Sequence, residues 1–381
     1  MLLPLFLLLA FGPPEFRSQE LARDLKGGYQ VLPVDLNGDG RTDLIALASG
    51  MSKLVWFENP GRAEAEWPRH VLANGFRQMI NVAAYQRGPG AIPDLLLAHE
   101  FSNNPKQSRG TVSLLEAEAG KSAWKRRDIE DRPTSHRLKL ANGKFINAPL
   151  AAPESTAPNY EGTVPLVEYD PGKLPGTLAS RIVTAAEKGV WHGLSIGDFN
   201  HDGLEDIFTA AFNGIAVYVA QRDGNYERIA LDAGSRAAWP KSGASEIAQV
   251  RLNRKRRPDF VLATIEPWHG NELVVLERQG KQWKRTVLDN TFEEGHALVA
   301  ADFDGDGQDE ILYGARKGGG ALRLAWRDKA KGTWKIEKLA EGKIAVNSCA
   351  TLDADGDGHL DFACIGGATQ NLVLYRNTRE K

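Results

Sequence analysis

A nine-residue acidic pattern that recurs along the chain constrains its fold more than any other feature. In residues 302–310, DFDGDGQDE, carboxylates stand at the first, third, fifth and ninth positions. Carboxylates this close repel one another unless a cation lies between them, and oxygens at alternate positions suit the flexible shell of Ca²⁺. Gly307 permits the sharp turn, and apolar β-forming segments flank the pattern at 297–301 and 311–313. The pattern therefore predicts a calcium-closed loop between two strands, not the helix–loop–helix of an EF-hand.

Three further copies carry the same ligand types, so about four structural Ca²⁺ sites are expected. The predicted ligands in the four loops are Asp35, Asn37, Asp39 and Asp43; Asp198, Asn200, Asp202 and Asp206; Asp302, Asp304, Asp306 and Glu310; and Asp353, Asp355, Asp357 and Asp361. A fifth copy, residues 251–259, keeps the length but places Arg and Lys where the carboxylates stood. A side-chain cation can replace the metal there, so this loop is predicted to bind no calcium.

The spacing of these loops predicts the number of repeats. The ninth positions are residues 43, 94, 206, 259, 310 and 361, including a degenerate copy that ends at Asp94, and they are 51, 112, 53, 51 and 51 residues apart. The interval of 112 holds two periods, which places one hidden unit around residues 135–148. Seven units of about 50 residues with short strands are typical of a β-propeller. We therefore expect an all-β protein, a seven-bladed β-propeller with four-stranded blades.

The two ends of the chain complete this prediction. The last unit lacks a fourth strand, and residues 17–23 form an unassigned β-like segment, so the N-terminal strand should complete the last blade and leave no open sheet edge. Residues 1–12 are an apolar run too short to span a bilayer, which indicates a signal peptide within residues 1–18 and a single propeller domain at 19–381. A secreted or periplasmic location follows.

Composition excludes some classes of function. The net charge of −2 over 381 residues gives no electrostatic preference for nucleic acid or for a membrane surface. The two cysteines, Cys349 and Cys364, flank the last acidic loop almost symmetrically and should be neighbours. Two buried thiols are the simpler interpretation, and a disulfide is the alternative that an exported protein allows.

Histidines gather at one end of the predicted ring. The acidic loops share one face of the predicted ring. First-strand residues six positions before each loop should therefore lie near the axis on the opposite face, which we call the rim. These residues are Tyr29, His136, His192, Ser245, His296 and Asn347. The ends of the second strands add His99, Glu100, Glu266, His269 and Arg316 to the same rim. Five of the eight histidines thus fall on it. Converging imidazoles and carboxylates can hold Zn²⁺ or another divalent metal, or act as general acids and bases near neutral pH.

These motifs resemble known families. The acidic hairpins are similar to the FG-GAP/VCBS repeats of integrin-α-type seven-bladed propellers. The rim segments 135–138, 191–194, 265–270 and 294–298 resemble the propeller domain of aldos-2-ulose dehydratase, which implies elimination of water from keto-sugars such as 1,5-anhydrofructose with a metal in that domain. The cupin-like domains of the fungal members have no counterpart in this sequence, so an isomerase step attributed to them is not implied.

Two functions of different classes remain open. The first is a lyase acting on a keto- or anhydro-sugar, in which His136, His192 and His296 are metal ligands or bases, Glu100 and Glu266 are ligands or acid–base partners, and His99, His269 and Arg316 face the substrate. The second is a non-catalytic carbohydrate-binding or adhesion propeller, with a protein partner as a further option. The histidines on one rim favour the first, because a purely binding propeller does not require them.

Overall fold

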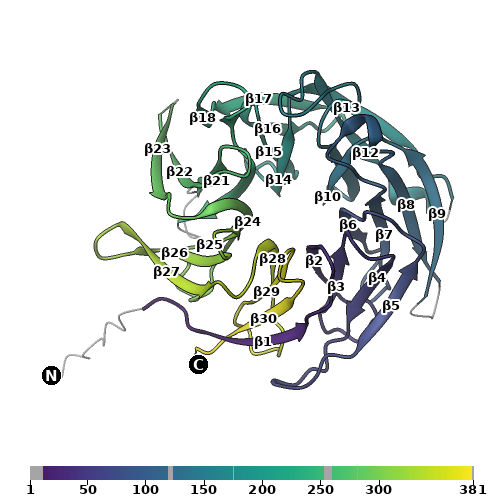
Figure 1. Ribbon diagram of the computed structural model, residues 1–381, viewed down its shortest axis with the longest axis horizontal. Coiled ribbons are helices and arrows are strands. Elements are labelled where there is room, and N and C mark those ends of the chain that lie inside the picture. The colour runs from purple at the N-terminus through teal and green to yellow at the C-terminus, as the bar shows by residue number, and fades with distance from the viewer. Residues whose placement is uncertain (1–11, 119–122, 175, 253–259, 281, 380–381) are drawn as a thin grey trace.

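The chain folds into a ring of seven antiparallel sheets, as expected. The computed structural model describes residues 12–118, 123–174, 176–252, 260–280 and 282–379. The sheets radiate from a common axis, with the first strand of each blade nearest the centre and the fourth on the outside (Figure 1). All seven sheets have four strands, so the seven-bladed prediction is confirmed.

The strands follow the order of the sequence in six of the blades. Blade one contains β2 (Gly28–Val34), β3 (Asp43–Ala48), β4 (Lys53–Phe57) and β5 (Arg69–Asn74). Blade two contains β6 (Asn81–Tyr85), β7 (Asp94–His99), β8 (Thr111–Ala117) and β9 (Trp124–Asp131). Blade three, the hidden unit, contains β10 (Ser135–Ala141), β11 (Lys144–Pro149), β12 (Thr163–Tyr169) and β13 (Ser180–Lys188). Blade four contains β14 (Trp191–Gly197), β15 (Asp206–Ala211), β16 (Gly214–Ala220) and β17 (Tyr226–Asp232).

The remaining elements complete the ring. Blade five contains β20 (Glu246–Arg251), β21 (Phe260–Glu266), β22 (Glu272–Gln279) and β23 (Gln282–Asp289). Blade six contains β24 (Glu293–Ala301), β25 (Glu310–Lys317), β26 (Ala321–Asp328) and β27 (Thr333–Glu341). Blade seven contains β28 (Val346–Leu352), β29 (Asp361–Gly366) and β30 (Leu372–Asn377). Outside the blades lie the short hairpin β18 (Ser235–Arg236) and β19 (Ser242–Gly243) and two 3₁₀ turns, η1 (Pro105–Gln107) and η2 (Pro171–Lys173).

The N-terminal strand closes the ring. β1 (Phe16–Ala22) pairs antiparallel with β30, so the last sheet has the order β1-β30-β29-β28. The ring of Phe16 packs edge-on against Phe303 and Phe362, at centroid distances of 5.5 and 4.8 Å. β1 therefore begins two residues before Ser18, and a processed chain that retains this strand whole would be cut before Phe16.

Apolar side chains fill the spaces between neighbouring blades. One cluster joins Val55 and Phe57 of blade one to Ile365 and Leu374 of blade seven, all with 1% exposure or less. Comparable clusters lie between the other neighbouring sheets. Because this burial links each blade to both neighbours, it holds the first strands, and the side chains they carry, in fixed positions around the axis.

The two cysteines form a disulfide, so the interpretation as free thiols was wrong. Cys349 of β28 is paired directly opposite Cys364 of β29, with their Cα atoms 4.1 Å apart. The prediction that they are neighbours was correct because the acidic loop places the two positions in register. The bond crosses the two innermost strands of the blade that the N-terminus closes.

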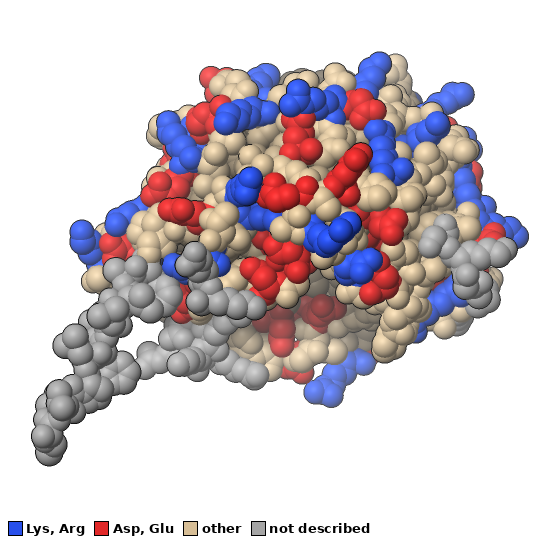
Figure 2. Space-filling model, turned by 90° about the horizontal axis from the view of Figure 1, so that it is seen from below, with Lys and Arg blue, Asp and Glu red and all other residues tan. Residues whose placement is uncertain are grey.

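The described surface carries charges of both signs. Within the described part of the chain, no helix has both the length and the apolar character needed to cross a bilayer. Viewed from the edge of the ring, basic and acidic side chains alternate over the surface (Figure 2). That mixed pattern agrees with the small net charge of the sequence.

Candidate active site on the channel floor and candidate calcium loops

The first strands of the blades enclose a central channel of about 800 Å³. Its walls extend from the level of Tyr29 and His296 to the level of Asp198, Arg251 and Asp309, which belong to the acidic loops. The predicted rim residues therefore lie at the end of the channel farthest from those loops. We call this end the channel floor.

A repeated irregularity of the backbone aims side chains at the floor. In five first strands the pairing with the second strand skips one residue, and the skipped residues are Tyr29, His136, His192, His296 and Asn347. An unpaired extra residue is a β-bulge, which bends the strand and redirects its side chain. These are five of the six positions obtained by counting back from the acidic loops.

Four imidazoles meet at the axis. The ring centroid of His192 lies 4.9 Å from that of His136, 4.8 Å from that of His269 and 5.0 Å from that of His296. His136, His192 and His296 are at most 2% exposed, and His269 is half-buried. One ring nitrogen from each of His192, His269 and His296 lies within 4.8 Å of the other two. The structure therefore brings together four of the five histidines predicted for the rim.

Hydrogen bonds fix the orientation of two of these rings. Nδ1 of His296 lies 2.6 Å from the carbonyl of Asn347, and Nδ1 of His192 lies 3.1 Å from the carbonyl of Ser245. A carbonyl can only accept, so Nδ1 of His296 carries the proton and its Nε2 has the lone pair. Nδ1 of His192 also faces Oε1 of Glu246, an acceptor at 2.8 Å, which favours the same tautomer, and its Nε2 accepts from a neighbouring donor. Metal-ligating histidines are typically held in this way. Nδ1 of His136 is buried and has no partner among the described residues.

His269 is held in the opposite tautomer. Nη2 of Arg316 lies 3.0 Å from its Nδ1. A guanidinium only donates, so Nδ1 accepts and Nε2 carries the proton, 3.1 Å from Nε2 of His192. His269 therefore suits the role of a hydrogen-bond donor to a ligand better than that of a metal ligand.

An ion pair lies directly above the imidazoles. Nη2 of Arg137 is 2.7 Å from Oε1 of Glu246, and the same oxygen is 2.8 Å from Nδ1 of His192. Arg137 also donates from Nε to the carbonyl of His192, at 2.8 Å. Both side chains line the channel, so Glu246 faces any molecule that reaches the floor.

Burial sets the protonation of the site. It lowers the pKa of His136, His192 and His296 well below the usual value, and the charge of Arg137 or His269 lowers it further. Burial together with Arg316 does the same to the pKa of His269. Burial raises the pKa of Glu246 to about 7, although Arg137 opposes the shift. At neutral pH the cluster therefore consists of uncharged imidazoles beside a carboxyl group that can both take up and release a proton.

The floor is covered on its outer side. The Phe101 ring lies 5.3 Å from that of His136, and Trp268 packs against His269 at 4.5 Å. Tyr160, which follows the Pro-rich insertion, is 3% exposed and lies edge-on against Trp268. Of the four imidazoles His296 lines the channel, and the other three adjoin it or His192 through the ring contacts given above.

Three predicted rim residues lie away from the cluster. His99 bonds Ser113 at 2.8 Å and packs edge-on against Phe76. Glu100 accepts from Thr111 and Arg109, and Glu266 accepts from Thr264 and Arg285 within its own blade. The second strand is one strand removed from the axis, so its side chains pack between or within blades. His269 lies beyond the end of β21, and Arg316 lies near the end of β25, so both side chains reach the cluster.

Sequence reasoning missed Arg137 and Glu246 and assigned no role to Tyr29. Arg137 and Glu246 each directly follow a counted position, His136 and Ser245. Behind a bulge, the next residue also faces the axis, and this signal could have identified Arg137. The Tyr29 hydroxyl lies 2.8 Å from Nε2 of His136 and 3.5 Å from Nε2 of His296.

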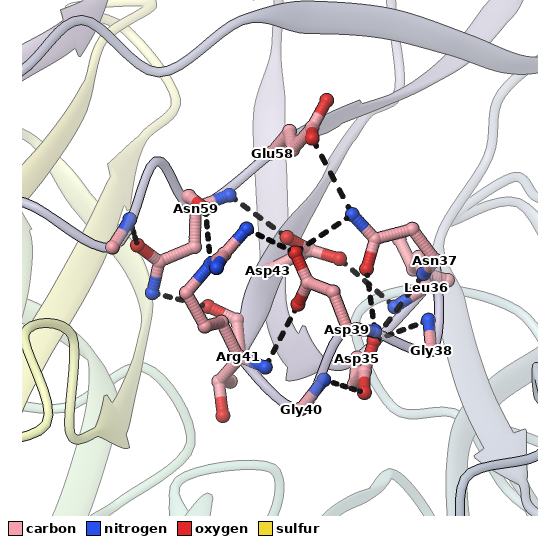
Figure 3. A network of polar contacts seen from close by, with 12 residues as sticks. Asp35, Leu36, Asn37, Gly38, Asp39, Gly40, Arg41, Asp43, Glu58 and Asn59 are labelled. Atoms are coloured by element: carbon pink, nitrogen blue, oxygen red, sulfur yellow. Dashed lines mark hydrogen bonds and ion pairs between the residues drawn. The ribbon is translucent and has the colours of Figure 1, made fainter.

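The acidic loops have a common geometry, shown for residues 35–43 in Figure 3. Asp35 accepts from the backbone of Gly40 at 2.9 Å, and Asp39 accepts from the backbone of Arg41 at 2.8 Å (Figure 3). The ninth residue, Asp43, is fully buried and accepts from the backbone of Leu36 and Asn59. Asp206 and Asp361 make the equivalent two bonds. The ninth acid thus fastens the loop to the end of the third strand.

The first, third and fifth positions provide the convergent oxygens. Carboxylate oxygens of Asp302, Asp304 and Asp306 lie within 4.8 Å of one another, and so do those of Asp353, Asp355 and Asp357. Burial and the neighbouring Asp306 raise the pKa of Asp304 to about 6. A divalent cation would relieve this repulsion, and an all-oxygen donor set fits Ca²⁺. Calcium binding itself stays a prediction.

The basic loop of blade five makes a different contact. Backbone N and Nε of Arg251 donate to Oδ2 of Asp309, at 2.8 and 3.0 Å, and the backbone N–H of Asp309 donates to the carbonyl of Arg251, at 2.7 Å. Asp309 is 1% exposed. A guanidinium at the first position of this loop therefore pairs with an acid of blade six, while most of the loop, residues 253–259, lies outside the described residues.

Comparison with known proteins supports the repeat and the fold. Residues 302–364 match the model of the FG-GAP-like repeat. Cartilage acidic protein 1 is 27% identical over 237 residues in Mus musculus and 29% identical over 238 residues in Homo sapiens. The matched region spans 56% of this chain but only 36% and 35% of those relatives. A solved lectin from Agrocybe aegerita, whose structure describes recognition of non-reducing terminal N-acetylglucosamine, superposes with a TM-score of 0.51 at 14% identity, covering 83% of this chain and 81% of the lectin. That likeness is one of fold.

Proposed function

We propose that this seven-bladed propeller with an FG-GAP-like repeat is a metal-assisted lyase that removes water from a keto- or anhydro-sugar on its channel floor. The observation that carries the proposal is the meeting of four uncharged, largely buried imidazoles beside Glu246 and Arg137, which line the central channel. Perturbed titratable groups concentrated in one cavity are typical of catalytic sites.

The cluster fits Zn²⁺ or another divalent transition metal. His192 and His296 would hold it through Nε2, because their Nδ1 atoms are committed to backbone carbonyls. His136, whose ring lies 4.9 Å from that of His192 and whose Nδ1 has no partner among the described residues, is the proposed third ligand, while the nitrogens that already converge are those of His192, His269 and His296. When bound, such an ion polarises the carbonyl of a substrate.

The chain's own residues would move the proton. The carboxylate of Glu246 takes the proton from the carbon next to the sugar carbonyl. The electron pair of that C–H bond forms the new C=C bond as the C–O bond to the neighbouring hydroxyl breaks, and Glu246 returns the proton to this hydroxyl, which leaves as water. A pKa of about 7 suits a group that both accepts and donates. Arg137 orients Glu246, and His269 and Tyr29 offer hydrogen bonds to the sugar.

The rest of the molecule would serve as a scaffold. Calcium in the four acidic loops would brace the face opposite the floor. The disulfide supports export through the expected signal peptide, because such bonds persist in oxidising compartments. The expected partner is a sugar-derived small molecule rather than nucleic acid.

A non-catalytic carbohydrate-binding propeller is the second candidate. The fold likeness to a lectin favours it. A lectin has no need of Glu246 as a proton carrier, so the two proposals separate on turnover.

The experiment is an ultraviolet assay for the conjugated enone formed from 1,5-anhydrofructose, using protein supplied with Zn²⁺. The proposal expects turnover by wild type, a fall of about 10²–10⁴-fold in Glu246→Gln, and no change in His70→Ala, which lies on β5 away from the channel. Absence of turnover in the metal-loaded wild type, or a Glu246→Gln variant as fast as wild type, would contradict it.

A further inference from the structure

One cation in the channel, Lys139, has no direct ion pair, although Glu246 lies near enough to act on its charge. Among the described charged residues that line it, Arg137 pairs with Glu246 and Arg251 pairs with Asp309. Asp198, at the mouth, belongs to a predicted calcium loop. Lys139 lines the same channel and has no hydrogen bond or ion pair to any described residue.

Lys139 lies on the same strand as Arg137, farther from the channel floor. It lies two residues beyond Arg137 on β10, on the side of the acidic loops, so both side chains project to the same side of the strand. Two residues along a strand span roughly 7 Å. The Cα atom of Lys139 is therefore one step above that of Arg137, towards the acidic loops, and both side chains line the same channel.

Two channel-lining groups can serve a ligand. Lys139 is exposed to the channel, and desolvation by the surrounding strands together with the neighbouring Arg137 lowers its pKa. Nε2 of Gln249, another channel-lining side chain, is buried without a partner among the described residues. A buried polar group without a partner is destabilising, so Gln249 is arranged for a ligand that brings its own acceptor, and Lys139 offers that ligand a positive charge.

We propose that Lys139 binds the carboxylate of a sugar acid, so that among keto- or anhydro-sugars the channel prefers an anionic one, and a neutral sugar such as 1,5-anhydrofructose is the weaker substrate. Arg137, Lys139 and Glu246 together carry one excess positive charge, which fits a carboxylate better than a phosphate, since a phosphate carries nearly two negative charges at neutral pH. The ring of the bound acid would then lie over Glu246, with Gln249 donating to a hydroxyl. This inference names the substrate class of the proposed lyase and rests on that function for its role in catalysis, but binding can be measured without turnover.

The test is isothermal titration calorimetry with a matched pair of ring-locked probes, methyl β-D-glucopyranosiduronate and methyl β-D-glucopyranoside. The uronate should bind wild type at least about tenfold more tightly than the neutral glycoside, as loss of a charge-assisted hydrogen bond implies. Lys139→Met should lose this preference, and Lys139→Arg should keep most of it. Lys53→Met, at an exposed lysine on β4, is the matched control and should behave as wild type.

A second readout avoids substitution. The uronate should protect Lys139 of the wild type from trinitrobenzenesulfonate, measured by peptide mass spectrometry, and the neutral glycoside should not. Equal binding of the two probes, an unchanged preference in Lys139→Met, or tighter binding of glucose 6-phosphate than of the uronate would overturn the inference. If the uronate binds at Lys139 in a protein without transition metal or turnover, the lyase proposal fails and the anion site stands.

Discussion

The hydroxyl of Tyr29 in blade one lies 2.8 Å from Nε2 of His136 in blade three, although 107 positions separate the two residues in the sequence. Each is the extra residue of a β-bulge, so the contact exists because two first strands carry the same irregularity at the same height. The floor of the channel is thus assembled from one repeated backbone feature with different side chains.

Replacing Tyr29 by Phe should weaken transition-metal binding by about 10–100-fold with a minor loss of stability, because the hydroxyl orients an imidazole of the cluster. Competition with a chromophoric chelator measures the affinity. Tyr85→Phe, a ring that packs against Phe145 outside the floor, is the control. An unchanged affinity in Tyr29→Phe would show that the hydroxyl does not organise the cluster.

Removing calcium should destabilise the whole ring. Each saturated site adds about 2.7 kcal/mol when the free ion is at a hundred times its dissociation constant, so EGTA should lower the melting temperature and Ca²⁺ should restore it. Asp355→Asn should reduce the calcium-dependent part of the stability. The loop itself should keep its conformation, since Asn37 and Asn200 show that an amide fits the third position of these loops. Asp223→Asn, in an exposed turn, should not. A melting temperature that ignores both EGTA and calcium would contradict the prediction.

The basic loop should be stabilising without any metal. Asp309→Asn should cost about 1–3 kcal/mol of unfolding free energy, because a buried, charge-assisted contact with Arg251 is lost. Urea denaturation with and without EGTA measures it. A loss that calcium reverses would mean that Asp309 stabilises the protein through the calcium loop of blade six rather than through Arg251.

His99 should make the protein sensitive to acid. Burial and the nearby Arg126 lower its pKa to about 4. In the folded protein the imidazole therefore stays unprotonated at pH values where the unfolded chain, with an ordinary pKa of about 6.5, binds a proton. Its stabilising contribution is complete above that pH and is lost as the pH falls towards 4. Between pH 7 and 5, wild type should lose about 2 kcal/mol more than His99→Gln. His70→Gln, at a 42% exposed imidazole, is the control. Equal losses in wild type and His99→Gln would contradict the assignment.

Much of this architecture was predictable because the acidic loops recur at nearly constant spacing and always follow the first strand of a blade. The spacing from Asp43 to Asp361 indicated seven blades, and counting back six residues located His136, His192 and His296 on the floor. Glu266 was misplaced because the direction of a second-strand side chain depends on packing: its partner is Arg285 of the outer strand, which no local pattern reveals. Glu246 was missed because a lone acid in a strand has no motif.

Elemental analysis of purified wild type, His192→Ala and His70→Ala tests the central claim most directly. The account predicts about one equivalent of a transition metal per chain in wild type and His70→Ala, its loss in His192→Ala, and the same calcium content in all three. Calcium alone in every sample, or a transition metal that survives in His192→Ala, would contradict a metal centre on the channel floor.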